Sequence, residues 1–294
     1  MPIRDTALRS RNRRRLLIKV LYERDDDKTS GRCFTRIFYQ LRFHQKTAAA
    51  VGNSETLCYS LPIRETGRQY FLMSEVAQII AEILLRTESI QVYKEKPFVF
   101  VSGRISPVYI DCRKILSFPE EREYIVTELA KKAETAIGLA SIDIVAGGET
   151  AGIPYAAFVA HLIKKPMIYI RKQPKGYGGS KQIEGILEAG KKVLLVEDLI
   201  TDGLSKLRFN IGIRAAGAKM THCLCVFDYA SDRLNQHEGR DNLAKNDINL
   251  HVLANWDDVL DTGLSKSYFS ENASKQIIDF LKDPENWGRK MGFV

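Results

Sequence analysis

The sequence predicts an α/β fold over residues 73–294, with a parallel sheet flanked by helices. Short apolar segments rich in β-branched residues alternate with segments of helical periodicity, an order typical of parallel sheets with right-handed crossovers. In addition, polar or glycine-rich turns follow two of the strands, at 147–152 and 197–205. Open α/β sheets bind their ligands at the carboxyl ends of such strands, so these turns indicate where a site is expected.

The helices are predicted from their caps and apolar spacing. Ser74 is expected to cap a helix that follows Met73 directly, and Pro119 begins a helix with glutamates in its first turn that runs to about residue 137. Further helices are expected from Pro154, over about 205–216, around 256–260 and over 271–281. Buried strands are expected at 142–146 and 193–196, further strands at 167–170 and 223–227, and short strands at 98–101 and from Leu250.

Residues 1–72 differ from the rest of the chain. They contain 15 Lys and Arg against 7 Asp and Glu, and so account for all of the formal net charge of +8. Without a sustained period, they are interpreted as a basic extension that is disordered or not native. An organellar transit peptide, a basic arm for an anionic surface, and translated sequence upstream of a native start at Met73 are the alternatives. We favour the last, because an N-capped helix follows Met73 and Asp25–Asp27 are atypical of a transit peptide.

The amino-acid composition indicates which cellular compartment and which classes of binding partner to expect. Residues 73–294 are electrically balanced, so the basic character of the chain does not indicate a nucleic-acid-binding domain, and no run of 18 apolar residues indicates a membrane span. The cysteines are odd in number and lack the spacing of a disulfide framework or a zinc site: Cys33, Cys58, Cys112, Cys223 and Cys225. A reducing cytoplasm is therefore expected, with no nucleic acid and no membrane as partner.

The segment 193–206 contains the most informative pattern. The expected strand 193–196 leads into Glu197 and Asp198, then into a tight turn at Thr201–Gly203, with Ser205 expected to cap the next helix. Hydroxyls and backbone N–H groups at a helix N-terminus bind anions, whereas two carboxylates repel a bare phosphate and suit sugar hydroxyls. The combination predicts a sugar-phosphate site; the alternative is an ordinary strand-to-helix loop with acidic residues.

Three further segments have polar or glycine-rich character. Residues 171–179 are basic and glycine-rich, and form either a mobile loop that closes over a polyanion or a solvated hairpin. Glycines of 147–152 permit close approach to a pyrophosphate, although many such loops are glycine-rich. Residues 102–111 form either a pocket for a flat ring or a structural turn.

Taken in order, these segments resemble orotate phosphoribosyltransferases, a branch of the type I phosphoribosyltransferases. The resemblance depends on Phe98-Val-Phe-Val-Ser-Gly-Arg-Ile-Ser-Pro-Val-Tyr-Ile-Asp111, Gly147-Gly-Glu-Thr-Ala-Gly-Ile-Pro154, the Arg-Lys-x-x-Lys loop and the segment 193–206, and covers nearly all of 73–294. It implies a type I phosphoribosyltransferase fold with a small hood subdomain. It also implies a pentosyltransferase that moves ribosyl 5-phosphate from phosphoribosyl pyrophosphate (PRPP) to orotate in pyrimidine (UMP) biosynthesis, giving orotidine 5′-monophosphate and pyrophosphate.

The resemblance also implies roles for individual residues. Catalysis is expected from Lys175, Arg171 and Asp198. Contacts to PRPP are expected from Thr150, Ala151, Arg171, Lys172, Lys175, Tyr177, Glu197, Asp198, Leu199, Ile200, Thr201, Asp202, Gly203, Leu204 and Ser205. Contacts to orotate are expected from Ser102, Gly103, Tyr109, Ile110, Thr201 and Tyr229. Mg²⁺ is expected to be held by pyrophosphate and ribose oxygens with no direct protein ligand, and a homodimer is expected in which Arg171 reaches the neighbouring site.

Four positions depart from the family's usual pattern. Val101 replaces a lysine, Tyr177 a loop histidine, Leu204 a small residue of the phosphate turn, and Tyr229 an arginine that meets the orotate carboxylate. Two alternative functions remain open: a phosphoribosyltransferase for another base, and a non-catalytic PRPP-sensing regulator that binds nucleic acid. The segments 102–111 and 171–175 favour the orotate enzyme over both.

Overall fold

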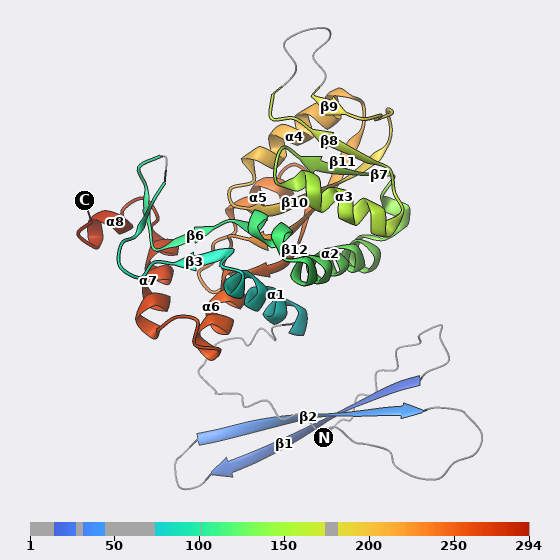
Figure 1. The fold of residues 1–294 in the computed structure, drawn as a ribbon. Helices are drawn as coiled ribbons and strands as arrows, with labels where there is room; N and C mark the ends of the chain where they lie inside the picture. Colours follow the sequence, from blue (N-terminus) through green and yellow to red (C-terminus); the bar gives the residue numbers. More distant parts are fainter. Residues whose placement is uncertain (1–14, 28–31, 45–73, 101, 174–181, 294) are drawn as a thin grey trace. The chain divides into compact units, whose positions relative to one another are not determined.

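The computed structural model describes residues 15–27, 32–44, 74–100, 102–173 and 182–293, with side chains from Ser74 onward (Figure 1). The chain divides into two compact units, Met1–Leu72 and Met73–Val294. In the first unit, β1 (Arg15–Asp27) pairs with β2 (Arg32–His44) in an antiparallel ladder that places Arg15 opposite His44. These strands differ from the extension without regular structure that the sequence predicts, although both segments are rich in residues that favour strands.

The second unit is built on a six-stranded sheet in the order β12-β11-β10-β7-β8-β9. All neighbours are parallel except β9, which runs antiparallel to β8. The predicted parallel sheet is confirmed. The strands are β7 (Ile144–Gly148), β8 (Met167–Ile170), β9 (Ile183–Glu184), β10 (Lys192–Ile200), β11 (Lys219–Asp228) and β12 (Asn249–Asn255).

Helices cover both faces of this sheet (Figure 1). Leu194 and Val196 of β10 pack on the face covered by α1 (Glu75–Arg86), α2 (Pro119–Lys132) and α3 (Gly152–Ile163). Val193 and Leu195 point to the opposite face, toward α4 (Leu204–Ala215) and α5 (Glu238–Ala244). Side chains of a strand point alternately to the two faces of a sheet, and here both faces are covered by helices. Every residue of 193–196 is therefore apolar. The predicted cap of α1 is confirmed, because the Ser74 side chain accepts a hydrogen bond from Ala77 N.

A smaller layer lies beside the sheet, where the resemblance implied a hood (Figure 1). It contains two antiparallel strand pairs, β3 (Ile90–Val92) with β6 (Val108–Ile110) and β4 (Phe98–Val99) with β5 (Ile105–Ser106). Helices α6 (Trp256–Ser265), α7 (Glu271–Lys282) and α8 (Trp287–Lys290) complete it. Trp287 packs edge-on against Tyr93 and Phe280, with ring centroids 6.1 and 6.0 Å away. These contacts join the segment after β3 to helices α7 and α8.

Several element boundaries differ from the prediction. Helix α2 ends at Lys132 and continues as a single π-helical turn over Ala133–Ile137. Two 3-10 helices, Cys112–Ser117 and Leu139–Ser141, were not expected, nor were the short elements β3, β5, β6, β9, α5 and α8. Strand β10 runs four residues beyond Val196, because it keeps pairing with β11 after its ladder with β7 has ended opposite Gly147. In the described part of the chain, no helix is both long and apolar enough to cross a membrane.

A half-buried histidine pair on β11 and β12 predicts that the stability of the protein depends on pH in the acidic range. His222 Nδ1 lies 3.1 Å from His251 Nε2, and burial lowers the pKa of His251 to about 4 and also lowers that of His222. The unfolded chain therefore binds more protons than the folded chain between pH 6.5 and 4, and stability is expected to fall as the pH falls through that window. His251→Gln is expected to lose less stability between pH 7 and pH 5 than the wild type, as measured by urea unfolding at each pH. Equal losses in the two proteins would show that the pair does not contribute.

Candidate functional site

Two cavities adjoin at the carboxyl ends of β7, β10 and β11, and both are lined by Ile110 and Leu199. The acidic cavity, of about 610 Å³, is lined by Ile110, Asp111, Arg113, Glu149, Thr150, Ala151, Lys172, Gln173, Glu197, Asp198, Leu199, Ser205, Arg208 and Phe209. The tyrosine cavity, of about 920 Å³, is lined by residues that include Phe100, Arg104, Tyr109, Ile110, Thr201, Asp202, Tyr229 and Lys245. The strand ends and turns that the sequence analysis selected therefore come together in one region.

The Glu197 carboxylate is inserted between Gly148 and Gly152. Its Oε1 accepts a hydrogen bond of 2.9 Å from Gly148 N, and its Oε2 lies 2.9 Å from Lys206 Nζ of α4. A Cβ atom at Gly148 or Gly152 would lie 2.3 or 2.1 Å from Oε1, so both positions require glycine. From the sequence, these glycines are expected to permit close approach to a pyrophosphate; in the structure they accommodate a protein carboxylate. Both oxygens of Glu197 have protein partners, and its predicted ribose contact stays a prediction.

Asp198 lines the acidic cavity. It makes no ion pair with any residue of the described segments, in contrast to Glu197. Burial raises the pKa of both carboxyls, and the Lys206 ammonium opposes this shift. For Lys206, burial lowers the pKa but the neighbouring Glu197 raises it more, so the ammonium form of Lys206 is favoured. The two adjacent acids are thus different: Glu197 is part of the packing, and Asp198 remains available to a ligand.

The turn before α4 faces both cavities. Thr201 and Asp202 line the tyrosine cavity and Ser205 lines the acidic cavity. Gly203 is the N-cap residue of α4. Its φ of +77° is a conformation that favours glycine. The predicted Ser205 cap is wrong: Asp202 Oδ1 accepts from Leu204 N at 3.0 Å, and Ser205 lies inside the first turn.

Leu204 is less of an obstacle than its sequence position indicates. Its side chain is 48 % exposed and it lines neither cavity, so its bulk does not fill the space in front of the turn. Gly203 and the fully buried Ile200 also line neither cavity, and their predicted PRPP contacts stay predictions.

The predicted orotate residues separate into two groups. Tyr109, Ile110, Thr201 and Tyr229 line the tyrosine cavity, where the Tyr229 ring stacks edge-on against Trp256 with centroids 5.5 Å apart. Ser102 and Gly103 line neither cavity; they form the turn between β4 and β5, in which Gly103 has a φ of +84° and donates to Phe100 O at 2.8 Å. Within 102–111, the beginning is therefore a structural turn and the end faces a pocket.

The loop after β8 is described at its two ends. Lys172 lines the acidic cavity and its backbone N donates to Glu149 Oε2 at 2.8 Å. Arg171 lines neither cavity, and its Nη1 lies 3.7 Å from Glu184 Oε1 of β9. Lys175, Tyr177 and Val101 lie outside the described residues.

Comparison with known proteins identifies the family. A model described as "Phosphoribosyl transferase domain" matches residues 119–258. The orotate phosphoribosyltransferase of Jannaschia sp. (strain CCS1) is 44% identical over 214 residues, which cover 73% of this chain and 92% of that protein. The orotate phosphoribosyltransferase of Agrobacterium fabrum is 41% identical over 219 residues, covering 74% of this chain and 93% of that protein. The chain belongs to the orotate phosphoribosyltransferase family.

A solved structure supports the same assignment. The crystal structure of orotate phosphoribosyltransferase from Aeropyrum pernix is 27% identical, with a TM-score of 0.55, and the match covers 65% of this chain and 99% of that one. The fold class that the sequence predicted is therefore the fold of this family. The alignment lengths correspond to the second unit of the chain, which has 222 residues from Met73 to Val294.

Two cationic side chains at the acidic cavity, Arg113 and Arg208, were not among the site residues predicted from the sequence. Arg113 and Arg208 line the acidic cavity together with Lys172. Arg113 Nε is 2.6 Å from Asp111 Oδ1, whereas Arg208 makes no ion pair with a described residue. Arg208 follows Ser205 by three residues and so lies on the same face of α4, a spacing that was a usable signal in the sequence. Arg113 follows the end of the 102–111 segment by two residues but is brought to the cavity only by the 3-10 helix at 112–117.

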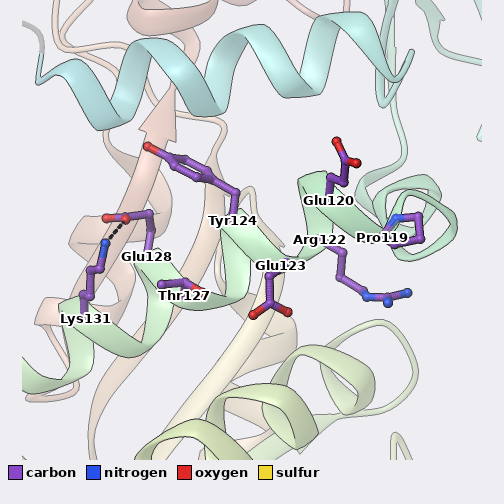
Figure 2. A pocket seen from close by; sticks show the side chains of 8 residues that line it. All are labelled: Pro119, Glu120, Arg122, Glu123, Tyr124, Thr127, Glu128 and Lys131. Atoms are coloured by element: carbon purple, nitrogen blue, oxygen red, sulfur yellow. Dashed lines mark hydrogen bonds and ion pairs between the residues drawn. The ribbon is translucent and has the colours of Figure 1, made fainter.

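A third hollow, of about 640 Å³, lies on α2 and is distinct from the family's candidate site. Figure 2 shows that its side chains project from a single helix and that Lys131 pairs with Glu128. Lys131 Nζ lies 2.5 Å from Glu128 Oε1. It is lined by Pro119, Glu120, Arg122, Glu123, Tyr124, Thr127, Glu128 and Lys131. Because it contains no residue of the predicted site and is bounded by one element, we assign it no role in the reaction.

Proposed function

We propose that this chain transfers ribosyl 5-phosphate from PRPP to N1 of orotate, giving orotidine 5′-monophosphate and pyrophosphate. One observation carries the proposal: Asp198, the turn before α4 and three cationic side chains meet around a cavity that adjoins a second, aromatic cavity. This arrangement suits a sugar phosphate with a polyanionic leaving group on one side and a flat ring on the other. The names of the relatives at 41–44% identity support the same reaction.

The chemistry requires charge stabilisation more than covalent catalysis. As pyrophosphate departs, the anomeric carbon becomes cationic and the leaving group gains negative charge. Asp198 is positioned to bind the ribose hydroxyls and hold the sugar, while Lys172, Arg113 and Arg208 are positioned to neutralise pyrophosphate. By resemblance, Lys175 and Arg171 add positive charge when the loop closes, with Arg171 acting in a neighbouring subunit.

Mg²⁺, a homodimer and a cytoplasmic location complete the proposal. In the described segments no group of three or more His, Cys, Asp or Glu side chains is arranged to hold a metal. We propose that Mg²⁺ is bound by PRPP oxygens, the ligand type that this cation prefers, and that it neutralises the pyrophosphate charge. Half-exposed apolar side chains at the start of α2 and on α3 suit a subunit contact: Phe118, Phe158 and Leu162. Light scattering measures the oligomeric state.

Orotate consumption with PRPP and Mg²⁺, measured on the full chain and on residues 73–294, tests the function. Both proteins are expected to consume orotate and to release pyrophosphate in equal amount, with no reaction when PRPP is omitted. Consumption of adenine, hypoxanthine or uracil instead of orotate would contradict the proposal and favour another base. PRPP-dependent binding of RNA or DNA without turnover of any base would favour the regulator.

A further inference from the structure

Arg104 stands at the edge of the tyrosine cavity, between the β4–β5 turn and strand β5. Its side chain is 39 % exposed, and the cavity that it lines also contains Tyr109, Thr201 and Tyr229. Burial raises the pKa of Tyr229, and the Arg104 charge acts in the opposite direction, which indicates that the guanidinium lies near the phenol. The aromatic part of the cavity thus has one adjacent cation.

The proposed substrate requires such a cation. Orotate carries a carboxylate at neutral pH, and Tyr229, whose phenol stays protonated there, offers no positive charge to receive it. Among the described Lys and Arg residues, only Arg104 and Lys245 line this cavity. Lys245 follows α5, and Asn242 of this helix donates to Asp202 O at 2.9 Å, so α5 borders the turn before α4. Arg104 is the cation on the side of the aromatic rings.

Arg104 already binds a carboxylate. Its Nη2 forms an ion pair with Glu285 Oε1, from the segment between α7 and α8, and Glu285 lines the same cavity. Nε and Nη1 of Arg104 donate to no described residue, so part of the guanidinium remains available. With side chains 39 % and 68 % exposed, the pair is of the weak surface kind and can be exchanged for a better carboxylate.

We propose that Arg104 binds the carboxylate of the pyrimidine substrate and thereby selects a carboxylated base over uracil. In the empty site Glu285 occupies the guanidinium, and the substrate carboxylate displaces it. A guanidinium suits this role because its parallel N–H groups match the two oxygens of a carboxylate. The inference rests on the proposed function and names the group that sets its base specificity.

Steady-state kinetics of Arg104→Gln, Arg104→Lys and Glu285→Gln test the inference, with thermal unfolding of each variant as the check on folding. Arg104→Gln is expected to raise KM for orotate by about 10- to 100-fold, the range for loss of a charged hydrogen bond, with KM for PRPP within about twofold. Arg104→Lys is expected to be intermediate. Glu285→Gln is expected to lower KM for orotate by about two- to fivefold, because it removes a competitor of surface-pair strength.

The two substitutions are expected to change KM for orotate in opposite directions, which distinguishes substrate binding from a purely structural role of the pair. If the pair only braces the β4–β5 turn, Arg104→Gln and Glu285→Gln raise KM for both substrates alike, and the inference is overturned. Unchanged KM for orotate in Arg104→Gln overturns it as well, while wild-type turnover of orotate keeps the proposed function intact. Absence of wild-type turnover would overturn the proposed function and the inference with it.

Discussion

Asp198→Asn is expected to lower kcat/KM for PRPP by about 10²–10³-fold, with little change in the free energy of unfolding. The reason is that Asp198 lines the acidic cavity, its carboxylate has no ion-pair partner among the described residues, and burial raises its pKa. A carboxylate of this kind contributes to binding and orientation of a ligand, whereas the folded protein gains little from its charge. Steady-state kinetics with orotate, PRPP and Mg²⁺ measure the loss, and urea unfolding measures stability.

Asp143→Asn is the matched control for this substitution. Asp143 precedes β7 and accepts a hydrogen bond of 2.8 Å from Lys192 N at the amino end of β10, the opposite edge of the sheet from the cavities. We expect it to lower the free energy of unfolding by about 1 kcal/mol and to leave kcat/KM unchanged. Equal loss of activity in both variants would show that Asp198 has no special role.

Lys206→Met is expected to destabilise the protein by about 3–5 kcal/mol, the range for removing one partner of a buried ion pair. The side chains of Lys206 and Glu197 are each 7 % exposed, so the substitution leaves a buried carboxylate with only the Gly148 N–H as partner. Urea unfolding of the full chain, followed by the fluorescence of Trp256 and Trp287, measures the change. Activity is expected to fall as well, because Glu197 connects β10 to the 147–152 loop beside the cavity.

Two further variants identify the cause. Lys266→Met removes a surface partner of Glu82, with side chains 49 % and 32 % exposed, and is expected to change stability by less than about 1 kcal/mol. In the double variant Glu197→Gln, Lys206→Met, the remaining buried group is neutral, so part of the lost stability is expected to return. Additive losses in the double variant would argue against charge as the cause.

Local patterns predicted the sheet and most helices because each depends on few neighbours. Met167–Ile170 was predicted with its observed bounds, and the Ser74 cap is confirmed, since a cap and a buried strand are recognisable within a few residues. The Ser205 cap was wrong because α4 begins at Leu204, with Gly203 as its N-cap residue, so Ser205 lies within the first turn. The short strands β3 to β6 were largely missed, as segments of two or three residues carry no measurable period.

The sequence by itself indicated a phosphoribosyltransferase, because strand, acids, turn and helix follow one another within a single segment, 193–206, and the segments 102–111 and 171–175 indicated the orotate branch. Only the tertiary structure decided what each side chain contacts. It paired Glu197 with Lys206 between two glycines, left Asp198 facing the cavity, and brought Arg104 and Glu285, 181 positions apart, to one cavity. Such contacts form between distant parts of the chain when the sheet and its helices pack, so no local pattern contains them.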